Sequence, residues 1–154
     1  MREFNDKDRA KKSQRLQLGE NPANLPAETL TDLESAVTSA LEDGCLPCPV
    51  GWRVADKLGV PRISVGAVLD KLGVRVANCQ LGFFRVEKTP HQDQRLVELS
   101  SEIANALRDL NAARNLTCTT AFELTRRFKT TPIKVSAAAS SLKLKIGNCQ
   151  LGCF

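Results

Sequence analysis

Apolar residues recur at spacings of three and four in two stretches of the chain, and this pattern predicts an amphipathic helix in each. The first stretch spans 25–44, where Gly44 is expected to close the helix, and the second spans 92–114. The apolar positions are Leu30, Leu33, Val37, Ala40 and Leu41 in the first stretch and Leu96, Leu99, Ile103, Leu107 and Leu110 in the second. We expect each stretch to be the first helix of a small unit.

Two shorter helices are predicted after each of these stretches. Their expected bounds are 50–58 and 62–72 in the first half, and 120–128 and 132–142 in the second half. Thr120 and Glu123 have the spacing of a capping box. Thr131 followed by Pro132 has the order of an N-cap and a helix-starting proline.

After the last helix of each half, the apolar period changes from 3.6 to 2, which is typical of a half-buried strand. Val74 and Val76 alternate with polar residues in the first half, and Leu144 and Ile146 do so in the second. A turn containing glycine is then expected to lead to a second strand at 83–86, whose counterpart is cut short by the end of the sequence. Each half therefore predicts helix, short extended piece, helix, turn, helix and hairpin.

The two halves are copies of one unit. Residues 78–84 read NCQLGFF and residues 148–154 read NCQLGCF, at an offset of 70 (148 − 78 = 70) that also aligns Cys48 with Cys118 and Ile63 with Ile133. A period this long exceeds the roughly 20 to 50 residues of solenoid repeats, so each copy should be a small domain. We expect a basic arm over 1–24, one repeat over 25–88 and a second over 89–154. Domains of this size are near the lower limit of independent stability, so the copies are expected to support each other.

The order of elements resembles the winged helix-turn-helix domain, with KLGVPRISVGAVLDKLGVRV at 57–76 similar to its central motif. The resemblance implies an α+β fold of two tandem winged-helix-like units, in which the third helix enters a DNA major groove and the hairpin touches the backbone. The sequence KIGNCQLGCF at 145–154 also resembles small proteins connected with molybdenum or tungsten formylmethanofuran dehydrogenases. That second resemblance implies an accessory or regulatory partner of such an oxidoreductase.

Charge favours a polyanionic partner. The net charge of +5 divides into +3 over 1–15, −6 over 16–45, +3 over 46–84, 0 over 85–115 and +5 over 116–154. Outward positions of the third helices hold few side chains that read bases, because they include Gly66, Ala67, Ser136 and Ala137. We therefore predict phosphate contacts with modest sequence choice from Arg62, Lys71, Arg75, Lys134, Lys143 and Lys145. The alternative is that these charges are solvated and that the small residues let another helix pack closely, as in a protein-interaction scaffold.

The six cysteines allow three interpretations. They are small buried hydrophobes, or ligands of zinc or an iron-sulfur cluster, or a redox pair that senses oxidants. The candidate ligand sets are Cys45, Cys48 and Cys79 in one copy and Cys118, Cys149 and Cys153 in the other. Structural zinc needs a fourth ligand from elsewhere, and His91, the only histidine, lies in the linker.

Gln80 and Gln150 recur within the best-preserved stretch although turn chemistry does not require them, so they are candidate partner contacts. An enzymatic role is not expected, because neither repeat contains a phosphate loop, a GxSxG motif or a histidine base. No apolar run approaches the roughly 18 to 20 residues of a membrane span, and residues 1–15 lack the apolar core of a secretory signal. The expected compartment is the cytoplasm.

Overall fold

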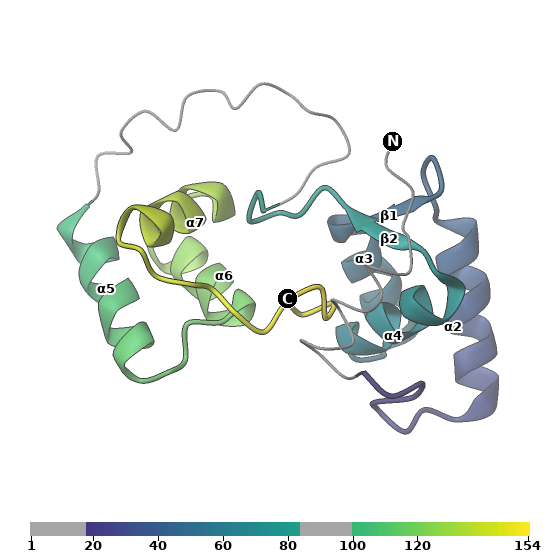
Figure 1. Ribbon diagram of the computed structural model, residues 1–154. Helices are drawn as coiled ribbons and strands as arrows, with labels where there is room; N and C mark the ends of the chain where they lie inside the picture. The colour runs from purple at the N-terminus through teal and green to yellow at the C-terminus, as the bar shows by residue number, and fades with distance from the viewer. Residues whose placement is uncertain (1–17, 84–99) are drawn as a thin grey trace. The chain divides into compact units, whose positions relative to one another are not determined.

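The computed structural model describes residues 18–83 and 100–154, which form a mixed α+β structure with six helices and one two-stranded sheet (Figure 1). Their contacts fall into two compact units. Unit 1 contains residues 18–79 together with Gln150–Phe154, and unit 2 is Gln80–Cys149. Most of the expected basic arm, the expected strand beyond residue 83 and the linker histidine lie outside the described residues. No helix in the described part of the chain combines the length and apolarity needed to cross a membrane.

Unit 1 is built on three mutually packed helices: α2 (Ala27–Ser39), α3 (Cys48–Leu58) and α4 (Arg62–Leu72). The predicted apolar stripe of α2 faces this core, since Leu33 and Val37 are fully buried. Gly59 ends α3 and Gly73 ends α4 in the left-handed conformation (φ 64° and 68°), which glycine adopts without steric penalty.

The end of α2 differs from the prediction. Gly44 does not close the helix, because α2 stops at Ser39 and the chain then forms a tight turn. Asp43 and Gly44 both have positive φ (49° and 74°), and Glu42 and Cys45 exchange two backbone hydrogen bonds across them (2.8 and 2.9 Å). This is the Asp-Gly turn that favours reversal of the chain, and it leads directly into strand β1.

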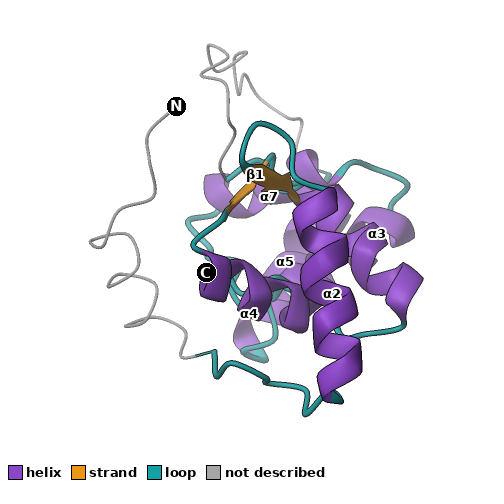
Figure 2. Ribbon diagram, turned by 90° about the vertical axis from the view of Figure 1, so that its right-hand side faces the viewer, coloured by secondary structure: helices purple, strands orange, loops and turns teal. Residues whose placement is uncertain are grey.

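The sheet of unit 1 pairs β1 (Cys45–Pro47) with β2 (Arg75–Ala77), the two orange strands of Figure 2. The segment before the second helix thus pairs with the strand after the third, and the two strands are parallel. A parallel pair needs a crossover, which α3 and α4 supply. The hairpin expected after β2 is not formed by the described residues, which continue through Asn78 in a left-handed conformation and a turn at Gln80 and Leu81.

Unit 2 packs α5 (Ser101–Ala112), α6 (Cys118–Arg127) and α7 (Pro132–Ser141) against one another. Residues 92–99, predicted to begin its first helix, lie outside the described residues. The sheet is reduced to a single parallel bridge between Thr117 and Gly147. The fully buried side chains include Leu107, Ala121 and Val135.

The capping box of α6 lies one turn earlier than predicted. Thr117, not Thr120, is the N-cap: its hydroxyl accepts from the Thr120 N–H (3.2 Å), while the Thr120 hydroxyl accepts from the Thr117 N–H (2.9 Å). Glu123 is therefore no part of the box. At α7 the prediction is confirmed, because the Thr131 hydroxyl accepts from the Lys134 N–H and Pro132 is the first helical residue.

Thr117→Ala is expected to destabilise unit 2 by about 1 kcal/mol, since it removes the acceptor of a helix-starting N–H. Thermal denaturation followed by circular dichroism measures the change. Thr119→Ala is the matched control, because Thr119 is exposed on the same helix turn and takes no part in the box. Equal shifts for the two variants would contradict the role of the box.

The backbone repeats with the period found in the sequence. Helices α3 and α6 begin 70 residues apart, as do α4 and α7, and the bridge at Thr117 and Gly147 matches the pair Pro47 and Ala77. Five left-handed positions also recur at this offset: Gly44 and Arg114, Gly59 and Lys129, Gly73 and Lys143, Asn78 and Asn148, and Gly82 and Gly152. Two copies of one sequence unit thus adopt the same path.

The compact units nevertheless differ from the sequence repeats at their last residues. Gln150–Phe154, which end the second repeat, belong to unit 1, and the equivalent residues from Gln80 onward, which end the first repeat, belong to unit 2. Each repeat therefore gives its Gln-Leu-Gly segment to the unit formed by the other repeat. The boundary expected between residues 88 and 89 separates the repeats but not the units.

Candidate functional site

The centre of the candidate site is the face of α4 that receives the segment Gln150–Phe154. Leu151 is fully buried there, with its side chain against the glycine of α3, Gly51. A Cβ built on Gly66 of α4 would overlap the Leu151 carbonyl oxygen and lie 2.8 Å from the carbonyl carbon. The backbone of the segment can approach α4 this closely only because residue 66 has no side chain.

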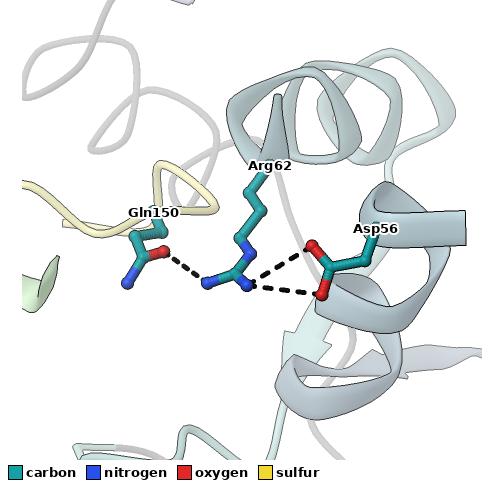
Figure 3. Close-up of polar contacts among 3 residues, drawn as sticks. All are labelled: Asp56, Arg62 and Gln150. Carbon is teal, nitrogen blue, oxygen red and sulfur yellow. Dashed lines mark hydrogen bonds and ion pairs between the residues drawn. The ribbon is translucent and has the colours of Figure 1, made fainter. Parts of the chain in front are cut away.

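Arg62, the first residue of α4, fixes the polar end of the segment (Figure 3). Its guanidinium donates to Gln150 Oε1 (2.6 Å) and to both carboxylate oxygens of Asp56 (3.4 Å each). The same guanidinium lies 3.8 Å from the centre of the Trp52 ring, within cation–π range. Two side chains of α3 therefore hold Arg62 in position for the amide of Gln150.

The glycine of each segment lies against an isoleucine of the receiving helix, and the two isoleucines occupy equivalent positions in the repeat. A Cβ on Gly152 would lie 3.1 Å from Ile63 Cδ1 and 2.6 Å from Leu18 Cδ1, whereas one on Gly82 would lie 3.7 Å from Ile133 Cγ1. Gly82 and Gly152 are equivalent positions of the repeat, and so are Ile63 and Ile133. Leu81, the counterpart of Leu151, is 2% exposed in unit 2. Both units therefore bind the segment on their third helix, and the space around the glycine of the segment is larger in unit 2.

The expectation that the small residues of the third helices face outward was wrong. Gly66, Ala67 and Ser136 are all buried, and in unit 1 every residue from Ser64 to Leu69 is buried. At Gly66 the reason is the docked segment, because the backbone of Leu151 lies where a Cβ would be. Of the outward positions expected on α7, Ser140 and Ser141 are exposed.

The predicted phosphate contacts in unit 1 already have interactions within the protein. Lys71 forms a hydrogen-bonded ion pair with Glu34 of α2, and this contact raises the Lys71 pKa above its ordinary value. Arg62 is engaged as described above, and Arg75 is half-buried on β2.

The predicted contacts in unit 2 are exposed. Lys134 lies in the first turn of α7, and Lys143 and Lys145 follow the end of that helix. Three further exposed cations, Arg126, Arg127 and Lys129, lie at the end of α6. Apart from any contact with phosphate, cations at this end of a helix stabilise it by complementing its dipole. We call these six residues the unit 2 cations. Residues 116–149 contain a single acidic residue, Glu123, and none of the unit 2 cations makes an ion pair within the described part of the chain.

The two units consequently differ in charge. The described residues of unit 1 contain five Lys or Arg and eight Asp or Glu (5 − 8 = −3), whereas those of unit 2 contain eight and three (8 − 3 = +5). The core of the first repeat keeps its charge of +3 over 46–84, but unit 1 also contains the six acidic residues of 18–45, so its described residues are acidic in sum and those of unit 2 are basic.

Four of the six cysteines are buried, namely Cys45, Cys48, Cys79 and Cys118, and Cys149 and Cys153 are half-buried. Cys48 and Cys118 are the first residues of α3 and α6, as their equivalence in the repeat requires. Cys118 and Cys149 belong to unit 2, whereas Cys153 belongs to unit 1. Within residues 18–83 and 100–154, no group of three or more Cys, His, Asp or Glu side chains is arranged to hold a metal ion. Thiol sensing and a link to a molybdenum or tungsten oxidoreductase stay predictions.

Sequence reasoning singled out Gln150 and Arg62 separately, as a partner contact and a phosphate contact, and the structure joins them in one hydrogen bond. It missed Trp52, Asp56 and Gly51, which complete the site. The only signal for them was indirect, since a Gln-Leu-Gly sequence that recurs in both repeats implies that each copy binds to a surface of the protein. Comparison with known proteins found no matching family model, no similar curated protein and no similar solved structure.

Proposed function

We propose that this chain is a DNA-binding module that grips duplex phosphates through unit 2, with modest sequence selectivity. The observation that supports the proposal best is the set of unit 2 cations, six exposed Lys and Arg side chains around α6 and α7 with one acidic residue among them. Cations without internal ion pairs are available to displace the counterions of a duplex, which is the main source of sequence-independent affinity.

The proposal includes the finer fold assignment. The pair α6 and α7, joined by a short turn at Lys129 and Thr130, is the part of the chain that we compare with a helix-turn-helix. The exposed residues of α7 are Ile133, Lys134, Ser140 and Ser141, and the Ser141 hydroxyl donates to the Ala137 carbonyl of its own helix. Lys134 is the only one of these side chains with the chemistry for a bidentate contact to guanine, so we expect phosphate contacts to dominate.

Unit 1 is then a supporting unit and not a second DNA reader. Its described residues carry a net charge of −3 and those of unit 2 carry +5, so the described part of unit 2 attracts a polyanion more strongly. Arg62 and Lys71 are bound to acidic partners, and α4 is covered. The tandem repeat therefore provides one DNA-contacting copy and one copy with a different task.

Replacing Lys134, Lys143 and Lys145 together by Gln is expected to weaken binding to duplex DNA and to lower the salt slope. Each lost phosphate contact removes about 0.9 from the slope of log K against log salt, so three lost contacts remove about 3. Fluorescence anisotropy with a labelled duplex of mixed sequence, measured over a series of salt concentrations, gives both quantities.

The matched control removes the same charge from unit 1 by replacing Arg53, Lys57 and Lys71, all exposed, by Gln. We expect this control to retain nearly the wild-type salt slope. If the wild-type chain fails to bind duplex DNA at low salt, or if the two triple variants lose affinity equally, the proposed role of unit 2 is wrong.

A further inference from the structure

We propose that the α3–α4 face of unit 1 is a receptor for Gln-Leu-Gly segments, and that a second copy of this chain can supply the segment in place of the chain's own Gln150–Phe154. The receptor consists of Gly51, Trp52 and Asp56 of α3 and Arg62 and Gly66 of α4. The proposal is independent of DNA binding, since it concerns the other unit.

The apolar part of the receptor selects a leucine whose backbone lies directly on a helix. Gly66 leaves room for the Leu151 carbonyl, and Gly51 leaves room for the leucine side chain, whose Cδ1 would lie 3.3 Å from a Cβ at that position. Leu151 loses all its exposure in this site. Full burial of a leucine side chain is worth roughly 1.5–3 kcal/mol, which is a large contribution for so short a segment.

The polar part of the receptor selects the glutamine. Arg62 is also held by Asp56 and by the Trp52 ring, contacts that do not involve the segment, so we expect little freedom to be lost when it donates to the Gln150 carbonyl oxygen. The following Gly152 lies in the left-handed conformation (φ 69°) against Ile63, where a Cβ would meet Leu18. Glutamine, leucine and glycine are therefore each read by a separate contact.

A second copy is the occupant that the chain itself indicates. The same segment occurs twice in the sequence, and in both occurrences it is bound by residues of the other repeat. Such reciprocal exchange between equivalent copies is what domain swapping between identical chains produces, and it makes the same contacts whichever chain provides the segment. The attachment of Gln150 to its own chain gives only an advantage in effective concentration, which is of millimolar order for a short flexible connection.

A peptide titration tests the receptor in the full-length chain. Leu151→Asp is expected to leave the site vacant, because a charged side chain cannot be buried there without a large desolvation penalty. A synthetic peptide with the sequence of residues 148–154, with serine in place of both cysteines, is then added. Trp52 is the only tryptophan of the chain, so its fluorescence reports directly on the site. We expect a saturable change in the variant and, at the same peptide concentrations, none in the wild-type chain, whose site is filled.

Two controls make the result specific. A peptide with aspartate in place of leucine is expected to give no response, and the double variant Gly66→Val/Leu151→Asp is expected to lose the response to the normal peptide. If circular dichroism shows that Leu151→Asp has lost helix, Gln150→Ala replaces it, since that variant keeps the buried leucine but loses the bond to Arg62 and should exchange its segment more readily than the wild type. A folded variant that gives no saturable response would overturn the receptor.

A mixing experiment tests the second copy. Gly66→Val blocks the receptor but leaves the segment intact, whereas Leu151→Asp leaves the receptor open but spoils the segment. We expect each variant alone to be monomeric by native mass spectrometry. We expect the mixture, at about 100 µM, to contain a complex with the sum of the two masses. This concentration lies below the millimolar effective concentration of a segment attached to its own chain. A mixture that stays monomeric while the peptide binds would show that the receptor does not accept a second copy, and would overturn that part of the proposal.

Discussion

Leu151→Ala is expected to destabilise unit 1 by about 2–5 kcal/mol, because it removes a fully buried leucine and leaves a cavity between α3 and α4. The substitution lies in the second repeat, yet the loss should appear in the first. Hydrogen exchange followed by mass spectrometry measures it, since protection is then assigned to each helix separately. We expect faster exchange in α3 and α4 and unchanged exchange in α5.

Leu81→Ala is the mirror-image control for this experiment. Leu81 lies in the first repeat and is 2% exposed within unit 2, so its removal should accelerate exchange in α6 and α7 and spare α2. A single melting temperature is a poor substitute, because two units need not unfold in one step. If each substitution instead weakened the unit built from its own repeat, the exchange of segments would be disproved.

The sequence predicted the helices well because their signals are local. The third helix of unit 1 begins and ends where proline, glycine and apolar spacing indicate, at Arg62–Leu72, and the proline of Thr131–Pro132 begins α7. The boundaries that failed have local reasons too. Asp43 and Gly44 prefer a chain reversal to a helix end, and Thr117 precedes the helix start that was placed at Thr120.

The exchange of segments could not be predicted from the same signals. The Gln-Leu-Gly letters are identical in both repeats, so nothing in them states which copy receives which segment. The parallel register of β1 and β2 adds to the difference: β2 pairs with β1, and the described residues beyond it make no hairpin partner but continue into the other unit. The recurrence of Gln80 and Gln150 predicted contacts with a partner, which stays a prediction, and only the fold shows that Arg62 of the same chain donates to Gln150.

The repeats have also diverged at the receptor, which explains why they need not share a function. Unit 1 has Arg62, Gly66 and Trp52, whereas the equivalent positions in unit 2 are Pro132, Ser136 and Phe122. Without the arginine, Gln80 has no guanidinium at the equivalent place in its receiving helix. Unit 1 is thus specialised for holding the segment, and unit 2 retains the exposed cations.

Gly66→Ala gives the sharpest test of how closely the segment lies on α4. Alanine in place of glycine inside a helix normally stabilises by up to about 1 kcal/mol. Here the new Cβ would overlap the Leu151 carbonyl oxygen, a backbone atom that cannot rotate away as a side chain does. The segment must therefore leave, and we expect unit 1 to lose about 2–5 kcal/mol, similar to the loss in Leu151→Ala.

Combining the two substitutions shows whether they act on the same contact. If both release the segment, Gly66→Ala/Leu151→Ala should be little less stable than either single variant, with a coupling energy of about 1–3 kcal/mol between the two positions. Gly147→Ala is the matched control, because a Cβ there meets nothing within 4 Å, and it should change stability by less than about 0.5 kcal/mol. Additive losses at Gly66 and Leu151 would mean that the two residues stabilise unit 1 separately, and that the segment stays on α4 when a methyl group is added beneath it.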